Sequence, residues 1–359
     1  MDAREFTNLL KSQLGKLALR IPLSWINVAT GGAPVMIDGQ TLDTRAQWLL
    51  KVFEQSGHPA FHEMPLSEGR PLFTETMLSL SKPMTPFKTP EIGEVVDRAM
   101  DGPGGKLPLR IYRPSGLGTQ RVPAILWIHG GGWSLGSLNA YDPPCRFFAA
   151  RGGCVVISVD YRLAPENRYP AQLEDCLAAW RWLTTSTDQL GVDPTRLVIA
   201  GDSTGGTLAA VLANEVRHDA IKPALQVLVY PATDLRMESR SYTLFGEGFF
   251  FTRKGMDWAR GNYLGDDLGL IDNPRVSPLL SEDLSGVAPT LVYTAGFDPL
   301  RDEGIAYANK LRAAGVKTIH RNFDSLIHGF VGMGAVVQAA ARAMDDVVAG
   351  IRHELANQP

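Results

Sequence analysis

Cysteine is scarce in this chain of 359 residues, which has only Cys145, Cys154 and Cys176. An odd and sparse set of thiols excludes a disulfide framework and is typical of proteins from a reducing compartment. The sequence also lacks an apolar segment directly behind a basic start, which a signal peptide would have. The longest uncharged stretch near the start, residues 21–37, is too polar and too interrupted by proline and glycine to span a bilayer. We therefore expect a cytoplasmic protein without integral membrane association.

An excess of charge of either sign is absent as well. Lysine and arginine together number 35 and aspartate and glutamate 38, which gives a formal net charge of −3. A dedicated nucleic-acid-binding protein would normally be basic, so we expect no nucleic-acid partner. Hydrophobic residues make up 45% of the chain and charged residues 20%, which is typical of a globular protein and excludes a disordered one.

The first 95 residues differ in pattern from the rest. Apolar residues at three- and four-residue spacing predict an amphipathic helix over residues 4–21 and a second helix over 44–55. Three prolines in residues 82–90 predict a linker. We interpret residues 1–95 as an N-terminal helical region that is set apart from a second domain, residues 96–359.

The second part alternates short apolar runs with longer helical patterns, which predicts βαβ units and a mostly parallel sheet flanked by helices, an α/β fold. The predicted strands are 109–112, 124–128, 155–159, 197–200, 225–230, 290–294 and 317–320. The predicted helices are 172–183, 204–217, 299–314 and 335–355. Residues 238–264 interrupt the alternation and contain Phe249, Phe250 and Phe251. We expect this insertion to cover the carboxyl edge of the sheet, where such folds bind ligands.

The sequence Gly201-Asp202-Ser203-Thr204-Gly205 lies directly after a predicted strand and directly before a predicted helix. This is the G-x-S-x-G nucleophile elbow in its required context. The two glycines leave room for a serine that is held in a strained turn. We predict that Ser203 is a nucleophile; the alternative is a serine that only caps the helix.

A second glycine-rich segment, His-Gly-Gly-Gly-Trp at residues 129–133, follows another predicted strand. Consecutive glycines let backbone N–H groups turn toward a ligand. In a hydrolase with a nucleophile elbow such a loop donates hydrogen bonds to an oxyanion, together with the N–H of the residue after the nucleophile. This assigns the donors to Gly131, Gly132 and Thr204. The alternatives are a flexible turn or a phosphate loop, although a Walker A sequence is absent.

An acid and a base should follow the serine in the order Asp, His. Asp298 comes just after the predicted strand 290–294, and His328 follows the last predicted strand. We predict that they are the acid and the general base. Asp298 before Pro299 is also a good start for a helix, and both roles are compatible. Asp302 is the rival acid but falls one turn into the predicted helix.

Several motifs together resemble the hormone-sensitive-lipase family of bacterial esterases. They are His-Gly-Gly-Gly-Trp at 129–133, Tyr-Arg-Leu-Ala-Pro-Glu at 161–166, Gly-Asp-Ser-Thr-Gly-Gly at 201–206, Asp-Pro-Leu-Arg-Asp at 298–302 and His-Gly-Phe at 328–330. The resemblance implies an α/β-hydrolase fold with a helical cap, formed by the N-terminal helices and the insertion at 238–264. Two positions depart from the family pattern: Thr204 replaces the usual alanine and Asn167 the usual histidine.

The resemblance also implies an activity, which is hydrolysis of short- to medium-chain carboxylic esters without a cofactor. Its substrate would be a small-molecule ester, and a homodimer would be in keeping with the family. Trp133, Phe249, Phe250 and Phe251 are candidate walls of the substrate pocket. No metal site is expected, because Pro59 interrupts the helix that would align His58 and His62.

Two other functions remain as alternatives. An amidase or peptidase could use the same Ser203, Asp298 and His328. A small-molecule receptor could retain the fold without catalysis, but such a protein usually loses one of the three catalytic groups.

Overall fold

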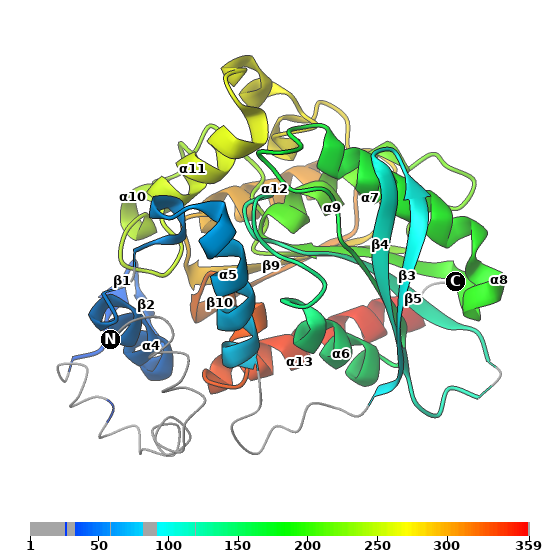
Figure 1. Ribbon diagram of the computed structural model, residues 1–359, viewed down its shortest axis with the longest axis horizontal. Coiled ribbons are helices and arrows are strands. Elements are labelled where there is room, and N and C mark those ends of the chain that lie inside the picture. Colours follow the sequence, from blue (N-terminus) through cyan, green and yellow to red (C-terminus); the bar gives the residue numbers. More distant parts are fainter. Residues whose placement is uncertain (1–25, 27–32, 58, 82–91, 119, 358–359) are drawn as a thin grey trace.

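The computed structural model describes residues 26, 33–57, 59–81, 92–118 and 120–357 (Figure 1). Within them an eight-stranded sheet has the order β10-β9-β8-β7-β5-β6-β4-β3. Its strands are β3 (Ile92–Gly102), β4 (Gly105–Pro114), β5 (Val122–Ile128), β6 (Val155–Val159), β7 (Val192–Asp202), β8 (Leu225–Val229), β9 (Thr290–Phe297) and β10 (Thr318–Ile327). Pairing is parallel from β6 to β10 and antiparallel for β3 and β4. The predicted mostly parallel sheet is confirmed.

Helices cover both faces of this sheet, as Figure 1 shows. One face carries α7 (Ala171–Thr185), α9 (Thr204–Glu215) and α12 (Arg301–Ala313); the other carries α6 (Asp142–Gly152) and α13 (Gln338–Ala356). Along β5, the side chains of Leu126 and Ile128 are buried under the helices of the first face, α7, α9 and α12. Those of Ile125 and Trp127 are buried on the other face, under α6 and α13. This alternation explains the continuous apolar run, because a strand buried on both faces has no polar side to show in its sequence.

In its described residues, the segment before the sheet contains a short hairpin and two helices. The hairpin pairs β1 (Met36–Ile37) with β2 (Gln40–Thr41), and α4 (Thr44–Gln55), the 3₁₀ turn η1 (Phe61–Glu63) and α5 (Leu66–Ser81) follow. The carboxylate of Asp43 accepts hydrogen bonds from the N–H groups of Arg45 and Ala46, so it caps α4. The helix predicted over 44–55 therefore forms as expected.

The insertion at 238–264 forms α10 (Arg240–Phe245) and α11 (Arg253–Leu264), which are followed by the 3₁₀ turns η2 (Leu268–Asp272) and η3 (Pro278–Leu280). In Figure 1 these two helices lie on the same side of the molecule as α4 and α5, and η1 packs against α11.

Some elements were not predicted. The strand β3 begins three residues before the expected boundary at 95, and about half of its side chains are exposed, so it lacks an apolar run. Two prolines at the start of α6 conceal that helix, and Gly69 and Pro71 conceal α5. The helix predicted over 4–21 and the linker predicted over 82–90 lie outside the described residues. In the described part of the chain, no helix combines the length and the apolar character needed to cross a membrane.

Candidate active site

Ser203 lies in the turn between β7 and α9 with φ 55° and ψ −125°, a strained conformation for a residue with a side chain. The neighbouring glycines make this turn possible. A Cβ on Gly205 would collide with the carbonyl oxygens of Ile128 and His129, and one on Gly201 with the carbonyl oxygen of Gly205. The strain therefore presents the Ser203 hydroxyl at the carboxyl end of β7.

The three residues predicted as nucleophile, base and acid meet in one hydrogen-bonded chain. Nε2 of His328 lies 2.9 Å from Oγ of Ser203, and Nδ1 of His328 lies 2.8 Å from Oδ2 of Asp298. The serine follows β7, the aspartate β9 and the histidine β10, so three strand ends at one edge of the sheet supply them. This order allows His328 to take a proton from the serine while Asp298 fixes the orientation of its ring.

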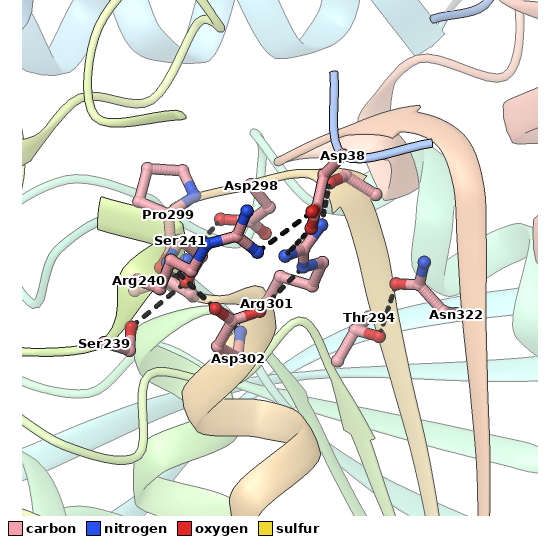
Figure 2. A network of polar contacts seen from close by, with 12 residues as sticks. Asp38, Ser239, Arg240, Ser241, Thr294, Asp298, Pro299, Arg301, Asp302 and Asn322 are labelled. Atoms are coloured by element: carbon pink, nitrogen blue, oxygen red, sulfur yellow. Dashed lines mark hydrogen bonds and ion pairs between the residues drawn. The ribbon is translucent and has the colours of Figure 1, made fainter. Parts of the chain in front are cut away.

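Asp298 uses its other oxygen locally. Its Oδ1 accepts a hydrogen bond from the N–H of Leu300 at 2.9 Å, and its side chain is fully buried. The helix α12 begins at Arg301 rather than at Pro299, so the proline precedes the helix instead of occupying its first position. Asp302 accepts hydrogen bonds from Nε of Arg301 and the N–H of Ser241, so it is engaged away from the histidine (Figure 2).

Two aromatic rings hold the imidazole of His328. The ring of Phe251 stacks on it at a centroid distance of 4.5 Å and an interplanar angle of 26°, and Tyr230 packs against it at 4.6 Å. Phe251 was predicted as a pocket wall, but Tyr230 was missed. Its position as the first residue after β8 was the available signal, because side chains at the carboxyl ends of parallel strands converge on one site.

The glycine loop after β5 has one contact that was not expected. Gly131 and Gly132 have φ values of 116° and 63°, which glycine adopts readily. The N–H of Gly132, a predicted oxyanion donor, donates a hydrogen bond to the hydroxyl oxygen of Thr204 at 3.0 Å. The N–H of Trp133 approaches the same oxygen at 3.4 Å. The threonine side chain thus already contacts one of the three predicted donors.

His129, the first residue of this glycine loop, packs beneath the loop in the protein interior. Its ring is fully buried between Tyr161 and Tyr141, with centroid distances of 4.3 and 5.3 Å, and its Nδ1 lies 2.8 Å from the carbonyl oxygen of Gly130. Burial lowers the pKa of this imidazole. A buried ring held in this way acts as a structural support for the loop.

Asp202 ties the elbow to the same loop. Its carboxylate accepts hydrogen bonds from the N–H of Gly130 at 2.9 Å and from the hydroxyls of Tyr141 and Tyr230 at 3.0 and 3.4 Å. Burial raises the pKa of Asp202 to about 6, although these donors and His328 oppose the rise. The residue before the nucleophile is thus a buried acid whose charge responds to mild acidity.

A cavity of about 710 Å³ opens onto Ser203 and His328. Its wall combines residues of α4 and α5 with Gly131, Gly132 and the insertion. The large apolar side chains among the lining residues include Leu50, Phe53, Leu72, Phe73, Met77, Phe249, Phe250, Phe251 and Trp258. Among the described residues, the lining includes the three predicted phenylalanines but not Trp133. The indole of Trp133 is fully buried and stacks on Tyr263 at 4.1 Å. The residues of α4 and α5 were not predicted as a wall, because their distance in sequence from Ser203 gives no signal.

Neither departure from the family pattern removes one of these groups. Asn167 contacts the carbonyl oxygen of Leu163 and lies away from the cavity lining given by the described residues. In that part of the chain no three His, Cys, Asp or Glu side chains are grouped to hold a metal ion.

Comparison with known proteins agrees with this geometry. A family model described as alpha/beta hydrolase fold matches residues 125–332. The chain is 37% identical to the carboxylic ester hydrolase LipN of Mycobacterium tuberculosis over 98% of this chain and 94% of that protein. It is 38% identical to the ethyl acetate hydrolase of Pseudomonas putida over 70% of this chain and 80% of that protein.

The fold is also similar to that of a solved ester hydrolase. The ester-hydrolase EH1AB1 from the metagenome of Lake Arreo, solved with a derivative of bipyridine phosphonate, superposes with a TM-score of 0.82 and 37% identity. The superposition covers 88% of this chain and 100% of that one. The chain therefore belongs to the alpha/beta hydrolase family, and its resemblance to the hormone-sensitive-lipase esterases within that family is confirmed.

Proposed function

We propose that the protein is a serine carboxylesterase that hydrolyses short- to medium-chain carboxylic esters through an acyl-enzyme. The observation that carries this proposal is the hydrogen-bonded chain from Ser203 through His328 to Asp298 at the base of an apolar cavity. The ester hydrolases named above, at 37–38% identity, support the same reaction.

In the first step Oγ of Ser203 attacks the ester carbonyl and His328 takes the serine proton on Nε2. Asp298 keeps Nδ1 protonated and stabilises the imidazolium that forms. The oxyanion of the tetrahedral intermediate accepts hydrogen bonds from the N–H groups of Gly131, Gly132 and Thr204. Each such donor contributes about 3 kcal/mol to stabilisation of the transition state.

In the second step His328 gives its proton to the leaving alcohol, and the acyl group remains on Ser203. Water then attacks the acyl-enzyme while His328 takes a proton from it, and His328 returns this proton to Oγ of Ser203 as the bond between Oγ and the acyl group breaks and the acid leaves. No step needs a cofactor, because proton transfer and the backbone donors supply the whole of the chemistry.

The cavity supports the substrate class. A site of this volume with a mostly apolar wall binds an uncharged molecule of moderate size. The near-neutral chain adds no long-range attraction for a charged substrate. We expect soluble esters with acyl chains up to about eight carbons, and no jump in rate when a triglyceride passes its solubility limit.

The test replaces Ser203 with alanine and measures hydrolysis of p-nitrophenyl butyrate. We expect Ser203→Ala to keep the circular dichroism spectrum and thermal midpoint of the wild type and to lose hydrolysis. Undiminished turnover in this folded variant would contradict the proposal. A series of p-nitrophenyl esters of increasing acyl length then defines the preferred chain.

Two measurements separate the alternatives. Matched ester and amide substrates distinguish an esterase from an amidase, and preferential amide cleavage would overturn our choice. An organophosphate labels an activated serine covalently, so wild-type protein should gain the adduct mass and Ser203→Ala should not. A non-catalytic receptor would remain unlabelled.

The three cysteines are buried and free, which supports a reducing compartment such as the cytoplasm. The helical segments before β3 and the insertion with α10 and α11 act together as the cap in this proposal. The homodimer implied by the family stays a prediction, which light scattering can check.

A further inference from the structure

A buried arginine lies directly beside the loop that carries Asp298. Arg301 is 5% exposed, and its guanidinium makes contacts on several sides. Its Nη1 donates to the carbonyl oxygen of Gly296 at 3.4 Å, and its Nε donates to Asp302 at 2.8 Å. Its backbone N–H donates to the carbonyl oxygen of Asp298 at 3.1 Å. Arg301 thus donates hydrogen bonds to two carbonyl groups of this loop, one before the proposed acid and one of the acid itself.

Another contact of this guanidinium comes from a distant part of the chain, in addition to the ring of Phe245, whose centroid lies 5.0 Å from Cζ of Arg301. Nη2 of Arg301 donates to Oδ2 of Asp38 at 2.8 Å, while Oδ1 of Asp38 accepts from Arg240 at 2.9 Å. Figure 2 shows Asp38 reaching from the hairpin to Arg301 and Arg240, with Asp302 on the other side of Arg301. These bonds hold the pKa of Asp38 below its usual range, so it stays ionised.

The two arginines that bind Asp38 are not equivalent. The side chain of Arg301 is 6% exposed and that of Arg240 is 65% exposed. An exposed ion pair contributes little, because water and salt compete for both charges. When a buried guanidinium loses its carboxylate partner, one of its N–H groups is left without a hydrogen bond, and the free-energy cost of removing that group from water is no longer offset. The Asp38–Arg301 bond is therefore the one that matters for the loop.

The hairpin that carries Asp38 is itself anchored to the wall of the cavity. Asp38 has φ 56° and is followed by Gly39 with φ 74°, the conformation of a tight Asp-Gly turn. The hairpin leads into α4, which lines the cavity with Leu50 and Phe53. Asp38 thus links the segment that carries α4 to the loop that carries Asp298, through its bond to Arg301.

We propose that Asp38 is a positioning residue for catalysis, which acts through Arg301 to hold the Asp298 loop in place when the N-terminal wall is docked. This inference rests on the proposed function. It adds a residue that lies 263 positions before Arg301 in the chain to the set that determines the rate. It also means that the position of Asp298 depends on how the hairpin and α4 pack against the rest of the protein.

The test compares Asp38→Asn with Arg240→Ala. Asparagine keeps the turn, because it adopts positive φ readily, but removes the charge. We expect Asp38→Asn to lower kcat for p-nitrophenyl butyrate at least fivefold, with a smaller change in KM. We also expect it to move the acid-side midpoint of the kcat–pH profile, since a displaced acid supports the imidazolium less well. Arg240→Ala, which removes only the exposed partner, should change kcat less than twofold.

Controls separate positioning from loss of folded protein. Organophosphate labelling counts the active sites, so kcat is expressed per labelled serine. If Asp38→Asn does not fold, Arg301→Lys replaces it, because lysine keeps a cation beside Asp302 but cannot reach Asp38 and Gly296 together. Arg301→Lys should then reproduce the loss of kcat and the shifted profile.

The outcomes are distinct. A folded Asp38→Asn with kcat within twofold of wild type and an unmoved profile would overturn the inference, as would an equal loss in Arg240→Ala. If Arg301→Lys is the variant used, unchanged kcat would do the same. Inactive wild-type protein in this assay would instead contradict the proposed function itself.

Discussion

The hydroxyl oxygen of Thr204 accepts a hydrogen bond from the N–H of Gly132 at 3.0 Å, although that N–H is a proposed donor to the oxyanion. The substrate oxygen must therefore compete with a side chain of the protein for this donor. A hydrogen bond of this kind has a net free energy of about 1 kcal/mol. The residue after the nucleophile thus influences the oxyanion site through its side chain as well as its backbone.

We expect Thr204→Ala to raise kcat/KM for p-nitrophenyl butyrate about fivefold, since removal of a competitor worth about 1 kcal/mol frees the N–H of Gly132. Thr204→Ser keeps the hydroxyl and should remain close to wild type. Steady-state kinetics of the three proteins measure the difference. A tenfold loss in Thr204→Ala would show instead that the hydroxyl holds the loop in its active form.

Phe251 should matter to the rate through its stacking on His328. Replacement by leucine removes a ring–ring contact of about 0.5–1.5 kcal/mol, so we expect kcat/KM to fall about three- to tenfold. Phe249→Leu is the matched control, because Phe249 lines the same cavity but packs on Phe245 and Phe297. Equal losses in both variants would argue against a role for the stacking.

Gly205 and Gly261 should respond to alanine in opposite ways. A Cβ at Gly205 meets the backbone of Ile128 and His129, which cannot move without disturbing the sheet, so Gly205→Ala should lose more than about 4 kcal/mol of stability. Gly261 lies inside α11 with no atom within 4 Å of the added Cβ, so Gly261→Ala should gain up to about 1 kcal/mol. Urea unfolding measures both changes, and a stable Gly205→Ala would refute the steric argument.

Asp202 should make stability depend on pH in mildly acidic solution. Its pKa of about 6 in the folded protein lies above the usual value of 3.8, so between these two values the folded protein retains a proton that the unfolded chain has lost. Its contribution to the free energy of unfolding is therefore present below about pH 4 and is lost as the pH rises to about 6. The stability difference between wild type and Asp202→Asn, from urea unfolding, should shrink across this window.

Asp97 provides the control for that experiment. The Arg110 guanidinium that donates to it lowers its pKa, so its titration falls below the window. The difference between wild type and Asp97→Asn should stay constant from pH 4 to 6. A constant difference for Asp202→Asn as well would show that its burial does not shift the titration as described.

Sequence alone located the strands that are buried on both faces. The run at β6 was predicted with both of its ends correct, because parallel strands under two layers of helices are apolar throughout. The antiparallel strand β3 was missed because it lies at the edge of the sheet and exposes about half of its side chains, so its sequence has no continuous apolar run. The helix α6 was missed because its prolines occupy its first turn, where they are compatible with a helix but look like a break.

The same contrast holds for the site. That Ser203, Asp298 and His328 come together could be predicted, since each follows a strand and has a motif around it. The bond between Thr204 and Gly132 could not, because it depends on a side-chain rotamer and joins positions 72 residues apart. The contact of Phe251 with His328 and the wall from α4 depend likewise on how a separate segment folds back over the sheet.

The wall that α4 and α5 supply has a consequence for how this enzyme can change. The proposed reacting groups come from the strand ends of the sheet, whereas part of the cavity lining comes from residues before β3. Selectivity can thus be redesigned by exchange of the hairpin and the two helices, residues 36–81, for an equivalent segment, with the chemistry left in place. The ion pair from Asp38 sets the condition for such a graft, because a replacement that omits this carboxylate would alter the rate together with the preference.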